Sequence, residues 1–389
     1  MTRIIQVGPL WQLREFDRPL VTASYFGFIP IVAPRVNKED LSCTEECGTH
    51  PHYDAAEKSA LIRTYLTQGL VSEPHPLSIA YRKHNSPRNR DDYSLHFIGS
   101  DSGVADATLI RSALSVLTDA GRKHLILDIN SIGDKESIAT YERELHSHVR
   151  KYISDLPEET REQIKKNVFS LFHLDTPEIH VMRHGAPSSV SFLSAQSRNH
   201  FKDVLEYVEA LGIEFRLIPE LVGNKHYCSN TIFAIRDTSG EEEETVAVGY
   251  HYSKLGRRLG VKREIPMAGV TLFLDRNKTS QRAAKLKSVY KELPRTKFCL
   301  VQLGREAKMK SLPLLERLRH EHIRVHHLIG KDKIAVQLSS AERLSASHII
   351  LLGQKEALDN TAIVRNVVTR AQGTVSMNEL PHYLKHLPI

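Results

Sequence analysis

The sequence predicts an α/β protein in two parts, a large domain with an antiparallel sheet flanked by helices and a small C-terminal α/β domain. Two pairs of strand-like segments enclose charged turns, which is typical of antiparallel strands. The pairs are "HPLSIAYRKH" with "YSLHFIG", and "NTIFAIRD" with "EETVAVGYHY". After about residue 297, strand-like and helix-like segments alternate, and this pattern predicts a small doubly wound α/β domain.

The composition is that of an ordinary globular protein of two or three domains, with 389 residues, 25% charged and 41% hydrophobic. No run of apolar residues is long enough to span a membrane. The first residues, "MTRIIQVGPLWQLREFDRP", do not resemble a secretory signal. Four cysteines favour a reducing compartment, so we predict a cytoplasmic protein without a disulfide scaffold.

The net charge of +7 is compatible with a nucleic-acid partner, and equally with a basic solvated surface. Much of this charge lies in one segment between the two predicted domains. Its basic residues are Lys278, Arg282, Lys285, Lys287, Lys291, Arg295 and Lys297. The segment is therefore either a solvated helix face or a contact for RNA phosphates.

Helical periodicity appears over 54–70, 104–121 and 198–212, and the last two segments end at Gly121 and Gly212. A charged helical region from Asp134 to about His200 interrupts the strands. Residues 213–222 and 267–276 are strand-like, and "LVGNKHYCSNTIFAI" is typical of a strand–turn–strand in the floor of a pocket.

These patterns predict a core domain over 1–276 with a helical insertion at about 134–200. A linker over 277–297 and a C-terminal domain over 298–389 follow.

Several segments, in order, resemble histidyl-tRNA synthetase, a class II aminoacyl-tRNA synthetase, from about Tyr25 onward. They include "FIGSDSGVADATLI", "LDINSIGDKESIATYERELHSHV" and "IRVHHLIGKDKIAVQLSSAERLSASHIILLGQKE". The resemblance implies the class II fold and a C-terminal anticodon-binding domain that contacts tRNA. It also implies a homodimer, because "YFGFIPIVAPRV", with Pro34, resembles the family's dimer-forming motif 1.

The resemblance further implies ATP with Mg²⁺ as the cofactor, held by arginines on its phosphates. Arg82, in "YRKHNSPRNRDDYSLHF", matches the arginine on the α-phosphate, and Arg276, in "PMAGVTLFLDRN", matches the one on the γ-phosphate. The substrate-pocket positions that still match are Arg63, Tyr227, Gly249 and Tyr252.

Other positions depart from the family pattern. Phe273 stands where the family has a glycine that lets the backbone approach a ligand closely. Gly223 replaces the arginine of "LVRGLDYYTRTVFE", and His251 replaces that of "GGRYDGL". The glutamate of "RPEGT", which binds the substrate amino group, becomes Ala56 unless a one-residue slip recruits Glu57.

Because of these losses, we assign no catalytic residue. They favour a degenerate paralogue that acts as a dimeric binding or regulatory protein and contacts tRNA. One alternative is a divergent but active histidine–tRNA ligase, in which Arg257, Arg258 or Lys225 replaces the missing arginine. A second alternative is a regulatory subunit of ATP phosphoribosyltransferase. That type of subunit resembles the same core but lacks the anticodon domain.

The segment "CTEECGTHPH" is a candidate metal site, because it holds Cys43, Cys47, His50 and His52. Cysteine and histidine at short spacing bind zinc. This spacing is not a standard zinc framework, so we expect two free cysteines in a polar loop and no zinc there.

Overall fold

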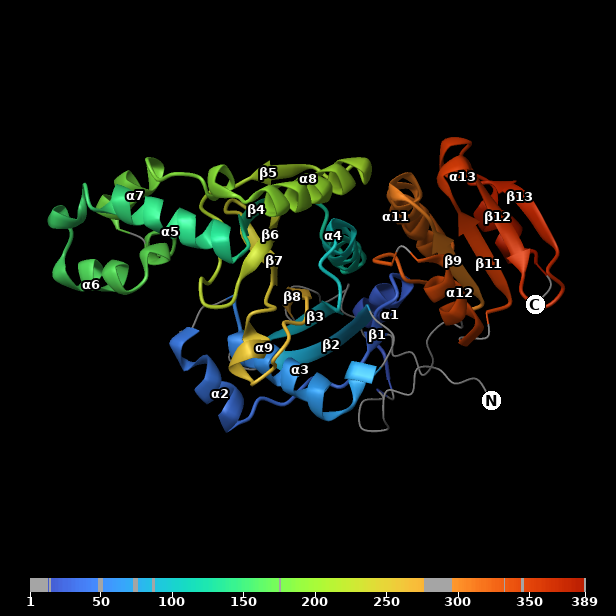
Figure 1. Cartoon of the computed structure of the whole chain (residues 1–389), viewed down its shortest axis with the longest axis horizontal. Coiled ribbons are helices and arrows are strands. Elements are labelled where there is room, and N and C mark those ends of the chain that lie inside the picture. Colours follow the sequence, from blue (N-terminus) through green and yellow to red (C-terminus); the bar gives the residue numbers. More distant parts are fainter. Residues whose placement is uncertain are drawn as a thin grey trace.

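The computed structural model of the chain describes residues 13, 15–47, 52–72, 76–85, 88–174, 176–275, 296–331, 333–343 and 346–387. A central body lies between a helical lobe (green) and the C-terminal domain (orange to red) in Figure 1. Arg276 and almost all of the predicted linker lie outside the described residues. In the part of the chain that is described, no helix is long and apolar enough to cross a membrane.

The central body is built on an eight-stranded sheet with the order β1-β2-β3-β8-β7-β6-β4-β5. The strands β1 and β5 pair in parallel with their neighbours, and the other pairs are antiparallel. The predicted pairs β2–β3 and β6–β7 are confirmed. The strands are β1 (Ile29–Pro30), β2 (Leu77–Asn85), β3 (Arg90–Ile98), β4 (Leu125–Gly133), β5 (Phe215–Leu217), β6 (Ser229–Asp237), β7 (Glu244–His251) and β8 (Met267–Asp275).

Helices cover both faces of this sheet. One face packs against α1 (Arg18–Tyr25), α4 (Gly103–Asp119) and α8 (Ala195–Ala210). The other face packs against α3 (Ala55–Thr67) and α9 (Leu255–Arg258), with α2 (Lys38–Thr44) outside them. Because side chains alternate along a strand, neighbouring residues serve different faces. We call the second face the pocket face and the first the helix face.

The helical lobe contains α5 (Lys135–Val149), α6 (Glu158–Lys166) and α7 (Pro177–His184). The predicted insertion extends to about residue 200, but α8 starts at Ala195 and packs against α4 in the central body. The strand predicted over 213–222 is also shorter, because only Phe215–Leu217 pairs with β4.

Side-chain caps fix where several helices begin. The Asp17 carboxylate accepts a hydrogen bond from Leu20 N at the start of α1, and Asp134 does the same for Ser137 N in α5. Gly121 and Gly212 follow α4 and α8 with φ of +94° and +64°, which confirms both predicted stops.

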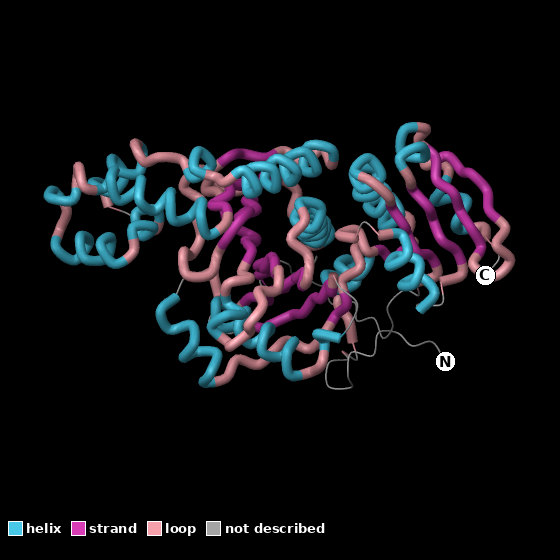
Figure 2. The backbone as a smooth tube through the Cα atoms, viewed as in Figure 1, coloured by secondary structure: helices cyan, strands magenta, loops and turns pink. Residues whose placement is uncertain are grey.

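The C-terminal domain contains a five-stranded sheet with the order β10-β9-β11-β12-β13 (Figure 2). The strands β10, β9 and β11 pair in parallel, whereas the β11–β12 and β12–β13 pairs are antiparallel. The predicted α/β domain is therefore confirmed, with antiparallel pairs at one edge of its sheet. The pattern missed β13, because its residues are polar and mostly exposed. The elements are β9 (Phe298–Gln302), α11 (Arg305–His320), β10 (Val325–His327), α12 (Ile334–Arg343), β11 (His348–Leu352), α13 (Gln354–Leu358), β12 (Thr361–Asn366), β13 (Gln372–Ser376) and α14 (Leu380–Lys385).

Ion pairs join this domain to α4. Arg111 Nη2 lies 2.7 Å from a Glu316 carboxylate oxygen, and Arg319 Nη1 lies 2.8 Å from Asp119. Val104 and Ala107 of α4 are also part of the hydrophobic core of the C-terminal domain.

Gly249, one of the predicted substrate-pocket residues, has a packing role in this sheet. A Cβ atom on Gly249 would lie 2.1 Å from Cζ of Phe233, whose ring belongs to the core of the helix face. The absence of a side chain at Gly249 therefore leaves room for the Phe233 ring on the helix face of β7. It does not open space on the pocket face.

We predict that Gly249→Ala lowers the free energy of unfolding by about 1–3 kcal/mol, because the methyl group would overpack a buried ring. Urea unfolding of the full chain measures this. Gly373→Ala is the control, since a Cβ atom at that strand position meets no atom within 4 Å. Equal stability of both variants would contradict the assigned role.

Candidate ligand pocket on the large sheet

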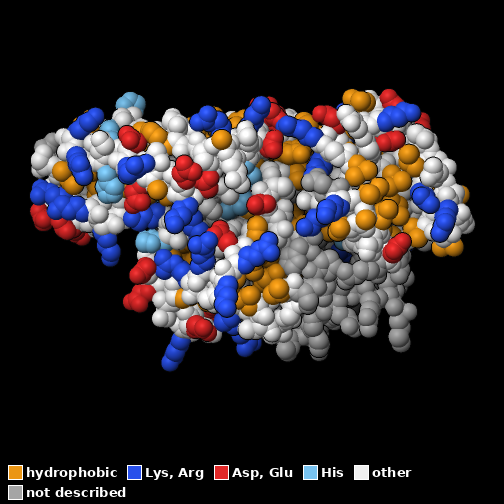
Figure 3. Space-filling model, viewed as in Figure 1, with side chains coloured by type: hydrophobic (Ala, Val, Ile, Leu, Met, Phe, Trp, Pro, Cys, Tyr) orange, Lys and Arg blue, Asp and Glu red, His pale blue; other side chains and the backbone are white. Residues whose placement is uncertain are grey.

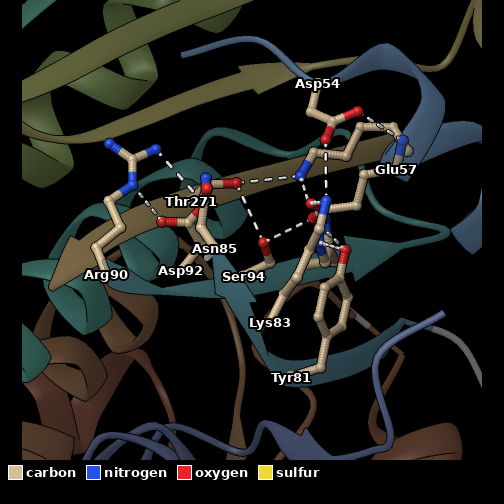
Figure 4. Close-up of polar contacts among 11 residues, drawn as sticks. Asp54, Glu57, Tyr81, Lys83, Asn85, Arg90, Asp92, Ser94 and Thr271 are labelled. Atoms are coloured by element: carbon tan, nitrogen blue, oxygen red, sulfur yellow. Dashed lines mark hydrogen bonds and ion pairs between the residues drawn. The ribbon is translucent and has the colours of Figure 1, made fainter. Parts of the chain in front are cut away.

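A buried carboxylate, Glu57, lies at the centre of the pocket face. Asp54 caps α3 by accepting from Glu57 N at 2.8 Å, which places Glu57 in the first helical turn above β2 and β3. Its side chain is 4% exposed. It accepts hydrogen bonds from the hydroxyls of Tyr81 at 2.8 Å and Ser94 at 3.0 Å (Figure 4).

Two lysines neutralise this carboxylate. Lys58 Nζ lies 3.2 Å from one Glu57 oxygen and Lys83 Nζ lies 3.1 Å from the other. Burial alone would raise the pKa of Glu57, but the charges of Lys58 and Lys83 outweigh burial and hold the pKa far below its ordinary range. Burial would lower the pKa of Lys83, but the carboxylates of Glu57 and Asp54 raise it above its ordinary value.

A neutral histidine extends the network. The Tyr81 hydroxyl donates to Glu57, so Nε2–H of His96 donates to the Tyr81 oxygen at 3.1 Å, and Nδ1 accepts from the Tyr252 hydroxyl at 2.9 Å. Burial, together with the nearby Lys58 charge, lowers the pKa of His96 well below its ordinary value. The polar groups in this chain of contacts are therefore paired within the protein.

An aromatic ring fills the next part of the pocket face. Phe273 of β8 points inward and is 6% exposed. The Arg90 guanidinium lies over the ring, 4.1 Å from its centroid, and is also paired with Asp92 at 2.6 Å. The His52 ring centroid lies 5.2 Å from that of Phe273. The Phe273 ring, in a cation–π contact with Arg90, thus occupies the space that a glycine would leave open.

The turn before β6 has no room for a side chain at Gly223. Its φ is +62°, and an added Cβ atom would lie 2.9 Å from Cδ1 of Ile232 and 3.0 Å from Sγ of Cys228. The predicted strand does not reach this turn, since β5 ends at Leu217 and residues 218–228 form turns and loop.

The three cations proposed as replacements for the missing arginine have other partners. Lys225 pairs with Glu142 of the helical lobe at 3.0 Å. Arg257 pairs with Glu264 at 3.3 Å, and Arg258 with Glu46 at 3.2 Å.

Arg82 lies on the helix face, away from Glu57. Its guanidinium pairs with Asp17 at 2.8 Å, beside Tyr93, whose hydroxyl donates to the same carboxylate. The next residue along β2, Lys83, points to the pocket face. The resemblance assigns Arg82 to a phosphate, but a sequence match does not determine which face of the strand a residue occupies, and here Lys83 rather than Arg82 lies on the face of Glu57.

Arg63 also lies outside the network. It pairs with Asp40 at 2.8 Å and donates to the Arg35 carbonyl, so it ties α3 to the α2 region. Tyr227 and Tyr252 are buried in the core of the pocket face, and Tyr252 joins the network through His96.

Sequence reasoning missed Lys58 and Lys83. Two signals could have found them. Residues 77, 79 and 81 alternate as apolar positions, which places residue 83 on the same face. Aligning Glu57 with the glutamate of "RPEGT" places Lys58 at the motif's glycine, so a cation stands beside the carboxylate.

Comparisons with known proteins agree with this architecture. Residues 297–387 match the family model described as an anticodon binding domain. The chain is 29% identical over 331 residues to the histidine–tRNA ligase of Thermosynechococcus vestitus, covering 83% of this chain and 76% of that protein. It is 28% identical over 312 residues to that of Bacillus subtilis, covering 78% and 72%.

The apo structure of the S. aureus histidyl-tRNA synthetase superposes with a TM-score of 0.53 at 22% identity, covering 94% of this chain and 93% of that one. The fold thus has the class II aminoacyl-tRNA synthetase architecture with a C-terminal anticodon-binding domain. Within that class, the chain is similar to histidine–tRNA ligases.

The described residues do not fit ATP and histidine in the way that the resemblance implies. A substrate ammonium would have to displace Lys58 or Lys83 from Glu57. A nucleotide would meet the Phe273 ring where the family has a glycine.

We predict that Glu57→Gln destabilises the chain by about 3–5 kcal/mol at pH 7, because it leaves Lys58 buried without an anion. The pKa of Glu57 is lower in the folded chain than its ordinary value of 4.5. Its contribution is therefore complete above about pH 4.5 and is lost as the pH falls further. Urea unfolding between pH 7 and pH 3.5 should show the difference from the wild-type chain shrinking at the acidic end.

Glu142→Gln is the control, since it removes a more exposed partner of Lys225 and should change stability by no more than about 1 kcal/mol. A Glu57→Gln chain as stable as the wild-type chain at pH 7 would refute the assigned role of the carboxylate.

Proposed function

We propose that the chain is a histidyl-tRNA synthetase-like protein that does not activate histidine and acts as a binding or regulatory protein. The observation that carries this proposal is the closed Glu57 network. In an active site of this type, a carboxylate must be available to the substrate amino group. Here two lysines already neutralise it, and its side chain is 4% exposed.

Two further features support the loss of activation. The reaction needs fixed cations where charge develops on the α-phosphate. Gly223 stands at the position of one family arginine, and Arg82 is paired with Asp17 on the helix face. Each lost contact of this type weakens transition-state stabilisation by about 2.7–4 kcal/mol.

We further propose that the C-terminal domain contacts tRNA or a related RNA. The family match over 297–387 supports this. Lys and Arg side chains are spread over the face in Figure 3 among acidic ones, with no single dominant basic patch there. We therefore base the RNA proposal on the domain match rather than on net charge.

A homodimer formed through the segment after α1 is part of the proposal. The exposed side chains of Val32 and Val36, at 44% and 37%, give this segment an apolar surface that a second copy would cover.

An active ligase is the second candidate, because Lys58, Lys83 and Arg90 bring three cations to the pocket face. In that case Lys83, rather than Arg82, would hold the α-phosphate. A regulatory subunit of ATP phosphoribosyltransferase is less favoured, because that type of subunit lacks the domain matched over 297–387.

Histidine-dependent ATP–pyrophosphate exchange tests the proposal. We expect the wild-type chain to give only background exchange, with the B. subtilis histidine–tRNA ligase as the positive control. Exchange that requires histidine would overturn the proposal. Lys83→Met and Arg82→Ala, neighbours on opposite faces of β2, then form a matched pair. Loss with Lys83→Met alone would identify the working cation.

RNA contact is tested separately by fluorescence anisotropy with labelled tRNA. We expect binding that weakens as salt rises from about 50 to 200 mM, since lysine and arginine contacts release counterions from phosphates. No binding at the lower salt concentration would remove RNA from the proposal and leave the question of activation unchanged.

A further inference from the structure

Three potential metal ligands meet on the helix face, away from the Glu57 network. Asp106 comes from α4, His200 from α8 and His251 from β7, elements that lie close together in Figure 1. Nε2 of His251 lies 2.8 Å from one oxygen of the Asp106 carboxylate, and Nε2 of His200 lies 3.0 Å from the other. The three ligand atoms all lie within 4.8 Å of one another.

We propose that Asp106, His200 and His251 form a binding site for one divalent transition-metal ion of the Zn²⁺ type. Two imidazoles and one carboxylate are a ligand set that Zn²⁺ and Fe²⁺ use in proteins. Ligand atoms about 2.0–2.2 Å from a tetrahedral ion are about 3.3 Å apart. The two imidazole–carboxylate contacts, at 2.8 and 3.0 Å, are close to that spacing. The ion would replace the two Nε2 protons that now bridge the imidazoles and the carboxylate.

The surroundings favour a cation over an empty cluster. The carboxylate of Asp106 is buried, and a buried carboxylate needs close partners in the protein interior. Asp101 and Asp203 add negative charge near His200. The Thr231 hydroxyl lies 3.3 Å from Nε2 of His200, within reach of a metal-bound water.

An ion can reach the site from the side of His200. Its side chain is 13% exposed, whereas those of Asp106 and His251 are 2% exposed. Because the three ligands come from three elements, a bound ion would hold α4, α8 and β7 together beneath the attached C-terminal domain. The expected role is therefore structural.

The sequence did not point to this site. His251 stands where the family pattern has an arginine, and the closely spaced cysteines and histidines of the sequence lie elsewhere. The three ligands are separated by 94 and 51 positions in the chain, with the tertiary fold bringing them together.

The test uses the full chain, stripped of metal with a chelator and titrated with Co²⁺, whose visible absorption reports the coordination of the ion. We expect one equivalent to bind, Zn²⁺ to displace it, and Zn²⁺ to raise the melting temperature of the wild-type chain. His200→Gln and His251→Gln should each weaken binding at least tenfold, by an order-of-magnitude estimate. His200→Gln is the safer variant for folding, because that side chain is less buried.

The matched control is His382→Gln. His382 of α14 and His386, the residue that follows this helix, have ring centroids 4.2 Å apart, so they form a pair at the surface that could bind an ion by themselves. The control variant should retain the full Co²⁺ signal. If the wild-type chain binds no Co²⁺, or if His200→Gln and His251→Gln bind as well as it does, the cluster is a hydrogen-bonded triad and the proposal is wrong. If only His382→Gln loses the Co²⁺ signal, the ion binds at the surface pair and the proposal is also wrong.

Discussion

The pairing of the buried Glu57 carboxylate with Lys58 and Lys83 is the interaction on which the pocket face depends. A buried carboxylate is tolerated only with close partners, and this one has two cations and two hydroxyl donors. The same contacts join the first turn of α3 to β2, β3 and β8, because Lys58 also donates to Thr271. The network that stabilises this part of the domain is therefore also the network that would have to open for a ligand to reach Glu57.

The pocket face combines a conventional class II sheet with side chains that differ from the pattern of the family it resembles. The scaffold of the sheet is intact, with tyrosines 227, 250 and 252 still packed in the core of the pocket face. The charged positions have partners within the protein. A lysine stands next to the carboxylate, an aromatic ring occupies the place of a glycine, and Arg82 serves an ion pair on the helix face. The proposed loss of activation rests on these side chains and not on the architecture, since function resides in the site.

The helix face has a different function in the molecule. Here α4 contacts the sheet, α8 and the C-terminal domain, and its charged residues form pairs with that domain. The Asp106 cluster lies within this layer, where two imidazoles share one carboxylate. A proposed ion at this place would stabilise the part of the fold that carries the anticodon-binding domain, independently of what the pocket face binds.

The sequence by itself determined the fold class, the order of the elements and most of their bounds. Strand alternation and glycine stops are local signals, and Gly121 and Gly212 end their helices as the sequence predicts. It also showed that Gly223 and Phe273 depart from the family's site.

Only the tertiary structure decided which cations meet Glu57. A strand residue one place away lies on the other face, so Lys83 and not Arg82 contacts Glu57. Gly249 likewise serves the packing of Phe233, a contact across two strands that local pattern does not encode. The Asp106, His200 and His251 cluster depends on three elements far apart in the chain, and such contacts exist only once the sheet and its helices have packed.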